Sequence, residues 1–537
     1  MTPTRVKKGF VEIGGRKAHL RISGRGPPIV MLHGSPGDGE MLAAEMGALS
    51  AAGFTCIALD TPGFGGSDAL AGDRLRVRDL AAATAEAMVA LGLPPCRVYG
   101  THTGAAIAAE LGVGWPAQVT GLLLEGLPLF TPQEVESLFG SHFAPMTLDP
   151  LGGHLFATWM RFRDQFTWFP WAARRPEALN PVTRPAAGDV DLWVSMFYRS
   201  YRTYGPAYRA ACAWGPLGLA VVEALDRSAI FMATAEDMLF PHLDRLPPLR
   251  ADQRIVRLDH DPKARLHAIG ALARALAGPD PAGADAPIVR GEGLVGGDLQ
   301  VGYVSTSAGQ VFVRAWGDPT ASAVMYLHDA FGTGRSLSPL ASRLATGRRL
   351  IAPDLPGSGQ SDDPPEAADR LEVTTAALGE TVDRLAGGDI EIAAQGSSCT
   401  LGASVAARAG ARSLVLHEAL PPGRVAAAAF APELPLSDDG GHWQKAWMMI
   451  RDAEVYIPWC DGRVEAQRRT QGEFDAAFLH EETVALMRSR ATYHLTPRLL
   501  LGVSADSPSS MTVRRTAGPG REALFQALAA PQPGVSP

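Results

Sequence analysis

One short stretch, Cys96–Gly112, combines a reactive side chain with the glycines of a sharp turn. It reads CRVYGTHTGAAIAAELG, which predicts a strand, a tight turn and a helix of small residues. Turns of the form G-x-S-x-G hold a nucleophilic serine at their centre, whereas this turn holds His102. An imidazole titrates near neutral pH, so His102 is a candidate general base, hydrogen-bond donor or nucleophile. We favour the acid–base or donor role, because an acyl-imidazole would need a second base for its hydrolysis; the plainer alternative is that His102 only fills space in an inactive scaffold.

The chain contains a long internal repeat. IVMLHGSPGDG at 29–39 is similar to VMYLHDAFGTG at 324–334. The strongest match needs no gap and pairs GGHLFATWMRFRDQFTWFPW at 152–171 with GGHWQKAWMMIRDAEVYIPW at 440–459. Solenoid repeats have periods of roughly 20–50 residues, so a spacing this long indicates a duplicated domain.

The repeat divides the chain into two expected domains. We expect domain 1 at 1–276 and domain 2 at 296–537, joined by an Ala-, Pro- and Gly-rich linker at 277–295. Within each copy, short apolar runs alternate with Ala/Leu-rich segments, a pattern typical of βαβ units and a mostly parallel sheet. Aromatic-rich insertions predict helical caps at about 129–225 and 422–496. The expected fold class is therefore α/β, with two fused domains.

Both halves resemble the α/β-hydrolase fold over most of the chain. The resemblance rests on a His-Gly loop after an early strand, a D-x-P-G-x-G-x-S-D loop, the sharp turn (the elbow), the cap and a late strand ending in Asp. It implies a mostly parallel central sheet with flanking helices, and a site at the strand C-termini beneath the cap. It also implies a nucleophile–acid–histidine order along the chain. The first elbow is similar to that of bacterial members reading G-x-H-T-G, a similarity that supplies no reaction.

The resemblance assigns candidate residues in domain 1. The backbone N–H of Thr103 and one near Ser35 would form an oxyanion site. Asp237 matches the catalytic acid, and His260 stands where the catalytic histidine would be, with His267 as a nearby alternative. If His260 is catalytic, Asp237 should accept its Nδ1–H and fix its tautomer. Domain 1 would then have an acid and a histidine, but no hydroxyl or thiol nucleophile.

Three further residues of domain 1 have two interpretations each. Glu125 ends the sixth strand, where it could support or replace Asp237, or cap the next helix. His154 begins a cap helix, where it could contact substrate or help to anchor the cap. Trp159 belongs to the cap aromatics, which are either core or the wall of a channel for an apolar substrate.

Domain 2 has lost different residues. Ser398 matches the nucleophile, Asp506 matches the acid, and no histidine follows Asp506 in the sequence. A serine without a base is a weak nucleophile, so we expect a vestigial site there, with His442 as the counterpart of His154. Its cap is shorter and more charged, so domain 2 is expected to be mainly a structural partner with a reduced pocket.

Composition narrows the function classes. The formal charge of −7 argues against a nucleic-acid surface, and 46% hydrophobic with 20% charged residues is ordinary for a globular protein. We expect no membrane span and no secretory signal, because no long apolar run is present. Five scattered cysteines without metal-ligand spacing indicate reduced thiols and a cytoplasmic location. No metal, nucleotide or flavin motif is present, so no cofactor is expected.

The leading hypothesis is a cofactor-independent hydrolase with a His102/His260/Asp237 centre. Its substrate would be a small apolar carbonyl compound: an ester, lactone, thioester or diketone. A lyase, isomerase or oxygenase on the same fold is one alternative, and a non-catalytic ligand-binding or scaffold protein is another. The two domains are expected to form an intramolecular pseudo-dimer, with further oligomerisation possible.

Overall fold

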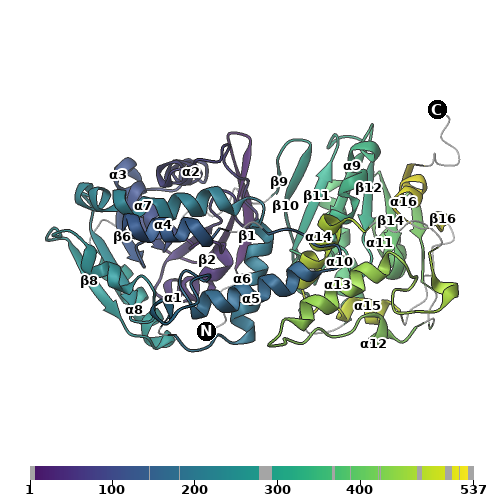
Figure 1. Ribbon diagram of the computed structural model, residues 1–537. Helices are drawn as coiled ribbons and strands as arrows, with labels where there is room; N and C mark the ends of the chain where they lie inside the picture. Colours follow the sequence, from purple (N-terminus) through teal and green to yellow (C-terminus); the bar gives the residue numbers. More distant parts are fainter. Residues whose placement is uncertain are drawn as a thin grey trace. The chain divides into compact units, whose positions relative to one another are not determined.

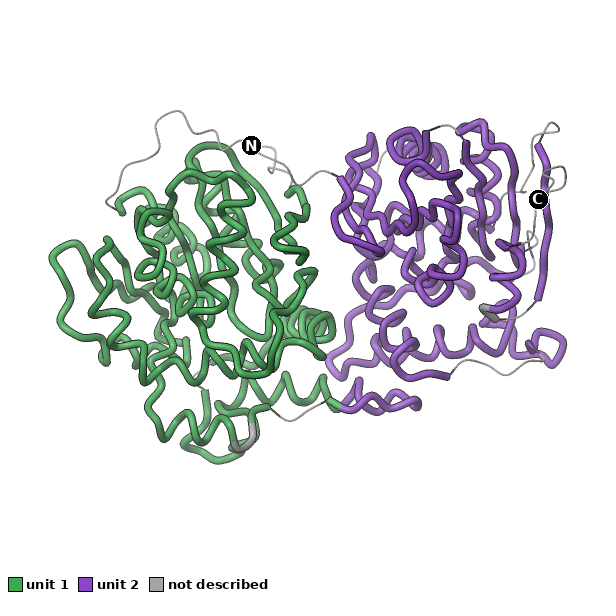
Figure 2. Tube along the Cα trace, turned by 90° about the horizontal axis from the view of Figure 1, so that it is seen from above, with its two compact units in different colours: residues 1–146, 157–291 green, residues 147–156, 292–537 purple. Residues whose placement is uncertain are grey.

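The chain forms two compact units. The computed structural model describes residues 6–143, 146–180, 182–276, 293–365, 369–387, 389–420, 423, 425–468, 474–501, 511–518 and 520–529. Figure 2 colours the units: unit 1 comprises 1–146 and 157–291, and unit 2 comprises 147–156 and 292–537. The expected linker lies outside the described residues up to 292, as does Asp506.

Unit 1 is built on an eight-stranded sheet with the order β1-β2-β4-β3-β5-β6-β7-β8. Figure 1 labels β1, β2, β6 and β8 of this sheet. β1 pairs antiparallel with β2, β2 pairs antiparallel with β4, and the remaining pairs are parallel. The central strands read as apolar runs, such as PIVML in β3 and TCIAL in β4, because both of their faces are covered. The strands are β1 Lys7–Ile13, β2 Arg16–Gly24, β3 Pro28–Leu32, β4 Thr55–Leu59, β5 Cys96–Thr101, β6 Val119–Glu125, β7 Ala229–Thr234 and β8 Gln253–Leu258.

Helices cover this sheet and also form the segment between β6 and β7. α1 packs against α8, and their side chains share an apolar cluster with Met31, Tyr99 and Leu123 of the sheet. α3 packs on β3, β5 and β6, and contacts α2 and α7. Between β6 and β7, over the segment expected as a cap, the chain forms α4 to α7. The helices are α1 Ala43–Ala51, α2 Val77–Ala90, α3 Thr103–Gly114, α4 Pro132–Ser141, α5 Gly153–Thr167, α6 Ala187–Ser200, α7 Tyr204–Ala224 and α8 Pro262–Ala275.

Unit 2 contains a second eight-stranded sheet, ordered β9-β10-β11-β13-β12-β14-β15-β16. In both sheets one pair of middle strands stands in the reverse of its chain order: β4 precedes β3 in unit 1, and β13 precedes β12 in unit 2. The pairs from β13 to β16 are parallel. The strands are β9 Gly293–Val295, β10 Leu299–Thr306, β11 Gly309–Trp316, β12 Ala323–Leu327, β13 Arg349–Pro353, β14 Ile390–Gln395, β15 Ser413–His417 and β16 Thr512–Thr516.

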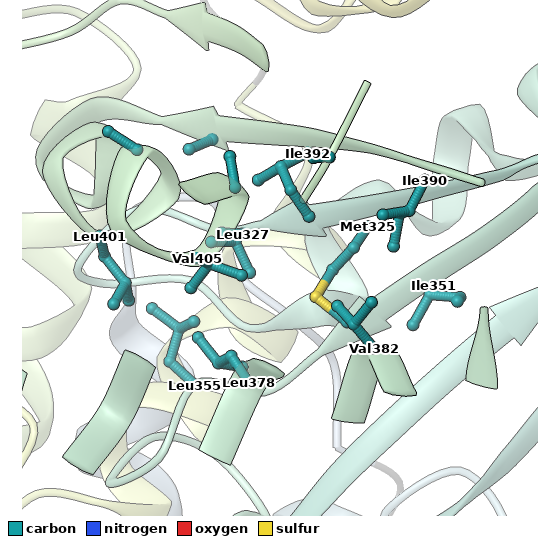
Figure 3. Packing of buried hydrophobic residues seen from close by; sticks show 14 of the residues in the cluster. Met325, Leu327, Ile351, Leu355, Leu378, Val382, Ile390, Ile392, Leu401 and Val405 are labelled. Carbon is teal, nitrogen blue, oxygen red and sulfur yellow. The ribbon is translucent and has the colours of Figure 1, made fainter. Parts of the chain in front are cut away.

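Figure 3 shows the apolar core of unit 2, in which Met325, Leu327, Ile392 and other sheet residues pack against Leu378 and Val405. Burial of aliphatic side chains is the main force that holds such a layer together. The helices of the unit are α9 Ser338–Leu344, α10 Arg370–Leu385, α11 Cys399–Ala409, α12 Ala427–Phe430, α13 Gly441–Ala453, α14 Ala476–Arg488, α15 Leu495–Leu500 and α16 Gly520–Ala529. Across the described ranges, no helix has both the length and the apolar composition needed to cross a membrane.

The division between the units differs from the expected domain boundary at one place. Residues 147–156, which include the first turn of α5, belong to unit 2, whereas the sequence suggested that they belong to domain 1. The other change of unit, between 291 and 292, falls inside the expected linker.

Candidate active site

His102 occupies a strained turn between β5 and α3. Its backbone has φ 50° and ψ −113°, a conformation that is uncommon for residues other than glycine. Gly104 has no side chain, and this lets the turn pass close to β3. A Cβ on Gly104 would lie 2.1 Å from the carbonyl oxygen of Leu32. The His102 N–H donates to the Glu125 carbonyl oxygen at 2.9 Å. The imidazole is thereby held beyond the C-terminal edge of the sheet.

The carboxylate of Asp237 binds the imidazole directly. Asp237 follows β7, and its Oδ2 lies 2.9 Å from Nε2 of His102. Its Oδ1 accepts the N–H of Leu239 at 2.8 Å. Burial raises the pKa of Asp237, but the charge and hydrogen bond of His102 and the Leu239 N–H outweigh it, so the pKa is lowered. An ionised carboxylate only accepts hydrogen bonds, so Nε2 carries the proton and Nδ1 carries a lone pair.

The environment favours the protonated form of His102. Burial lowers the pKa of the imidazole, but the charge and hydrogen bond of Asp237, with a contribution from Glu125, raise it above its ordinary value. The positive charge of Arg265 opposes this rise. About 38% of the side chain stays accessible, and the ring lines a cavity. Within the described part of the chain, Nδ1 has no hydrogen-bond partner, so it is available to a ligand.

A second ionic cluster, formed around Arg265 and Glu125, borders the same cavity as the His102–Asp237 pair, which we call the dyad. Arg265 donates from Nε and Nη2 to the carboxylate of Glu125, at 2.7 and 2.9 Å. The same guanidinium contacts Glu45 at 2.8 Å, and the Tyr99 hydroxyl donates to Glu125 at 2.6 Å. Glu125 is therefore held by Arg265 and Tyr99, and it does not replace Asp237 as the partner of His102. Sequence reasoning did not single out Arg265; the available signal was its place one turn into the helix after β8, at the same sheet edge as the elbow.

The cavity beside His102 has a volume of about 340 Å³, within the usual range for small-molecule sites. One part of its lining is polar, with Glu125, Asp237 and Arg265, and the other is largely aromatic. A smaller space of about 40 Å³, which His102 and Tyr208 also line, adjoins it. The full lining of the larger cavity is Ser35, Thr101, His102, Glu125, Phe162, Gln165, Phe166, Phe169, Asn180, Val182, Trp193, Tyr208, Thr234, Glu236, Asp237, Met238 and Arg265.

The expected oxyanion residues lie next to the elbow. Thr103 is the first residue of α3, where a helix leaves its N–H without an internal partner. Ser35 lines both cavities, and its N–H donates to Oγ1 of Thr103 at 3.3 Å. The structure therefore brings Ser35, Thr103, His102 and Asp237 together.

His260 is not part of this constellation, and its expected pairing with Asp237 is wrong. Its side chain is 74% exposed, and its nearest carboxylate, at 3.5 Å, is that of the adjacent Asp259. The reason is local: the chain turns from β8 into α8 within a few residues, leaving no loop to carry a histidine back over the sheet. The alternative His267 is exposed on α8, and neither histidine lines the cavity.

Two expected cap contacts also lie elsewhere. His154 belongs to unit 2, where its Nε2 lies 3.1 Å from Nδ1 of His480 and its ring packs edge-on against Trp447. Trp159 is buried in unit 1, with 1% of its surface exposed, and it does not line the cavity. Both residues pack in the interior, which agrees with the anchoring interpretation and not with substrate contact. Phe162 and Phe166, on the next turns of α5, line the cavity in their place.

Unit 2 has no side chain at the elbow. Leu327 of β12 pairs with Ala394 of β14, as Leu32 pairs with Gly100 in unit 1, so Gly396 takes the place of His102. Gly396 has φ 59°, and a Cβ there would lie 2.1 Å from Oδ2 of Asp329. The sequence placed Ser398 at the nucleophile position, but the residue at that position is Gly396, two residues earlier.

Ser398 itself has an ordinary helical backbone, with φ −78° and ψ −2°, and only 1% of it is exposed. His442 is buried, and its Nδ1 accepts the Ser437 N–H at 3.3 Å. Glu418 follows the end of β15 with φ 52° and contacts Arg468 at 2.9 Å. A cavity in unit 2, at about 140 Å³, is smaller than the cavity beside His102 in unit 1. In the described ranges, no group of three or more His, Cys, Asp or Glu residues is arranged to hold a metal ion.

Comparisons with known proteins give the fold of unit 1. Residues 27–265 match the family model described as alpha/beta hydrolase fold. The chain is 32% identical over 130 residues to a 2-hydroxy-6-oxo-6-phenylhexa-2,4-dienoate hydrolase of Burkholderia cepacia, covering 23% of this chain and 46% of that protein. It is 33% identical over 141 residues to a 2-hydroxy-6-oxononadienedioate/2-hydroxy-6-oxononatrienedioate hydrolase of Klebsiella pneumoniae, covering 24% and 48%. These matches span about half the length of the curated relatives.

Among solved structures, epoxide hydrolase A from Mycobacterium thermoresistibile is similar at 20% identity with a TM-score of 0.40, covering 51% of this chain and 100% of that one. The residues that the family model matches, 27–265, include the elbow, the helices α4 to α7 and the strand β7, which leads to Asp237. Unit 1 of this chain has the α/β-hydrolase fold.

Proposed function

We propose that unit 1 is a cofactor-independent hydrolase in which the His102–Asp237 dyad is the general base. The observation that carries this proposal is the 2.9 Å contact between Asp237 Oδ2 and His102 Nε2, which leaves the Nδ1 lone pair to the cavity. The centre is thus His/Asp, and not the His/His/Asp set expected from the sequence, because His260 is exposed.

The proposed reaction begins with a water molecule between Nδ1 and a substrate carbonyl. Nδ1 takes a proton as the water oxygen bonds to the carbonyl carbon, and Asp237 stabilises the resulting imidazolium. The tetrahedral oxyanion lies near Ser35 and Thr103. When it collapses, the bond to the leaving group breaks and the proton on Nδ1 passes to that group. General acid–base catalysis contributes about 10²–10⁴-fold, so positioning and oxyanion stabilisation must supply the rest.

The lining supports an uncharged aromatic substrate. Aromatic rings form much of the wall, and three carboxylates, Glu125, Glu236 and Asp237, face the cavity. The cation among the described lining residues, Arg265, already binds Glu125 and Glu45. A substrate carboxylate would meet like charges there, so an aryl ester, lactone, thioester or diketone suits the cavity better. The names of the curated relatives, which describe hydrolases of ketone-containing acids, support the carbonyl class.

The same dyad suits one other chemistry. A base without an adjacent hydroxyl nucleophile at the elbow could abstract a proton next to a carbonyl, which is the first step of many isomerase and lyase reactions. Hydrolysis alone places an oxygen atom from water in the product. Turnover in ¹⁸O-labelled water, followed by mass spectrometry, therefore separates the two reactions. Tight binding without turnover of any compound would instead favour a ligand-binding protein.

The deciding experiment measures turnover of neutral aryl esters, lactones and 1,3-diketones by the full chain and three variants. We expect His102→Ala and Asp237→Asn each to lower kcat/KM at least about tenfold. The first removes the imidazole that takes the proton, and the second removes the carboxylate charge that stabilises the imidazolium. His260→Ala is the matched control, since it removes an exposed histidine of unit 1 and should leave turnover unchanged. Full activity of His102→Ala, or loss of activity in His260→Ala, would refute the proposal.

We further propose that the two units arose by duplication and that unit 2 has a structural role. Two observations support this proposal. Both sheets have a pair of central strands in the reverse of chain order, β4-β3 and β13-β12, and His102 and Gly396 occupy equivalent positions after their strands. A glycine at the elbow supplies no reactive group, and Asp329 fills the space above it.

A further inference from the structure

The cavity of about 140 Å³ in unit 2 has no part in the reaction proposed for unit 1. Tyr326 and Gln395, which stand at the C-terminal ends of β12 and β14, line it together with Asp329 of the following loop. It therefore lies at the sheet edge that corresponds to the edge carrying His102 in unit 1. Ligands of α/β proteins usually bind at this edge, beyond the carboxyl ends of the strands.

Asp329 presents its carboxylate to this cavity in a fixed orientation. Oδ1 accepts the Ala330 N–H at 2.7 Å, and the N–H and hydroxyl of Ser397 at 2.8 and 2.7 Å. Oδ2 takes the space of an elbow side chain, since a Cβ on Gly396 would lie 2.1 Å from it. Within the described part of the chain, Oδ2 accepts no hydrogen bond and Asp329 has no cationic partner. A carboxylate oxygen is thus left to a ligand that can donate to it.

The charged lining of the cavity is predominantly acidic. Glu454 and Glu482 bring the lining carboxylates to three, and Glu482 is only 4% exposed. Among the described lining residues the single cation is Arg468, whose Nη1 already donates to both oxygens of Glu418, at 2.9 and 3.1 Å. A ligand anion would be repelled here, whereas a ligand cation would compensate carboxylates that are partly removed from water.

Three aromatic side chains, Tyr326, Phe331 and Phe478, line the same space. The Tyr326 hydroxyl donates to Oε1 of Gln395 at 2.5 Å, which holds its ring in place. Phe331 packs against Phe430, with ring centroids 5.1 Å apart. Aromatic faces attract organic cations and also provide apolar surface for the rest of such a molecule. The described residues hold no group of three or more His, Cys, Asp or Glu side chains arranged for a metal ion, so these features together favour an organic cation.

We propose that this cavity binds a small organic ammonium ion, a protonated primary amine on an apolar body. One N–H of the ammonium group donates to Oδ2 of Asp329, the carboxylates of Glu454 and Glu482 add to the attraction, and the apolar body lies against the aromatic rings. The ligand binds without any bond being made or broken, so the site requires no nucleophile or base in unit 2. This site goes beyond the structural role proposed for unit 2 and does not depend on the dyad of unit 1.

The test compares three probes of similar size and different charge. At neutral pH benzylamine is a cation, benzyl alcohol is uncharged and benzoate is an anion. Dissociation constants are measured by proton NMR titration on the full chain and its variants at one ionic strength. The first variant, Asp329→Asn, keeps the acceptor at Oδ1 but replaces Oδ2 with an amide NH₂ group, which carries no charge and accepts no hydrogen bond.

We expect the full chain to bind benzylamine at least about tenfold more tightly than benzyl alcohol or benzoate, because hydrogen bonds between charged groups are the stronger ones. Asp329→Asn should weaken binding of benzylamine at least about tenfold and binding of benzyl alcohol less than about twofold. The matched control is Asp318→Asn, which changes an aspartate of unit 2 outside the cavity lining. Oδ1 of Asp318 also accepts an N–H and a hydroxyl, those of Thr320, at 2.8 and 2.7 Å. This control should leave all three constants unchanged.

Two results would overturn the site. Equal affinities of the full chain and Asp329→Asn for benzylamine would show that the amine binds elsewhere. Binding of benzyl alcohol or benzoate to the full chain as tightly as benzylamine would show that the cavity does not select a cation. If Asp329→Asn does not fold, as judged by thermal unfolding, Glu454→Gln removes a different lining carboxylate and should weaken benzylamine binding selectively, by at least about threefold. An unselective loss in that variant, or none, would overturn the proposal in the same way.

Discussion

Asp237 binds the elbow histidine itself: its Oδ2 lies 2.9 Å from Nε2 of His102, with no second histidine between them. In a Ser-His-Asp arrangement the carboxylate orients a histidine, which in turn activates the elbow residue. In the proposed reaction, the base and the elbow residue are the same side chain. Two functional positions would then take the place of three, and Nδ1 of His102 would act on the substrate in place of a hydroxyl.

The pH dependence of turnover follows from this contact. Asp237 and Glu125 outweigh burial and raise the pKa of His102, and only the neutral imidazole can act as a base. We therefore expect kcat/KM to be low in acid and to rise with pH through a value above the ordinary histidine pKa of about 6.5. Asp237→Asn removes the negative charge, so the same rise should move to lower pH. The profiles are measured with the best aryl ester, alongside an NMR titration of His102. A rise at the same pH in both proteins would contradict the assignment.

Gly126 is expected to be essential to the dyad's geometry. It has φ 61°, and a Cβ there would lie 2.5 Å from Cδ2 of His102 and 2.8 Å from Oδ2 of Asp237. Gly126→Ala should therefore displace the dyad and lower kcat/KM at least about tenfold. The matched control is Gly92→Ala, at φ 67° with no atom within 4 Å of the added Cβ. Both variants should lose about 1–2 kcal/mol of stability from the left-handed backbone, but only Gly126→Ala should lose activity. Equal activities would show that the dyad tolerates displacement.

Arg265 is expected to affect both stability and the pKa of His102. Its guanidinium neutralises Glu125 and Glu45, which are buried. Arg265→Met would leave these carboxylates without their cation and should lower the free energy of unfolding by about 3–5 kcal/mol in chemical denaturation. Because Arg265 lowers the pKa of His102, the variant should also show a higher value by NMR. Arg257→Met, which breaks an exposed pair with Asp244, is the control and should change neither quantity. An unchanged His102 pKa in Arg265→Met would mean that the two ionic groups are independent.

Ser398 is expected to be dispensable. Its hydroxyl is buried without a hydrogen-bond partner among the described residues, and its backbone places it beyond the elbow position. Ser398→Ala should leave kcat/KM unchanged and change the free energy of unfolding by no more than about 1 kcal/mol. Steady-state kinetics and denaturant unfolding measure the two effects. Loss of turnover in this variant would place the reaction in unit 2.

Much of the fold is visible in local sequence. Strands such as PIVML and TCIAL are apolar throughout because parallel strands are covered on both faces, and that pattern needs no tertiary information to read. The glycines around His102 likewise reveal a turn in which the chain passes close to a neighbouring strand. The elbow and its histidine were therefore accessible from residue types and order, and the resemblance to the α/β-hydrolase fold pointed to Asp237.

The pairing register of the strands beside the elbow of unit 2 was harder to predict from the sequence. Ser398 looked like the nucleophile of the second half because it follows a strand and a glycine. The pairing of Leu327 with Ala394 places Gly396 there instead. A two-residue shift keeps the side-chain alternation of a strand, so the apolar pattern could not reveal the error.

The sequence by itself determined the α/β pattern, the elbow with His102 at its centre and the carboxylate after the late strand. Only the tertiary structure decided that Asp237 reaches His102, that His260 is turned to solvent and that His154 packs with unit 2. Elements and turns depend on residues within a few positions of each other, and composition records them. Contacts such as the one between His102 and Asp237 depend on how strands are ordered in the sheet and how long each loop is, and these are settled by packing of the whole unit.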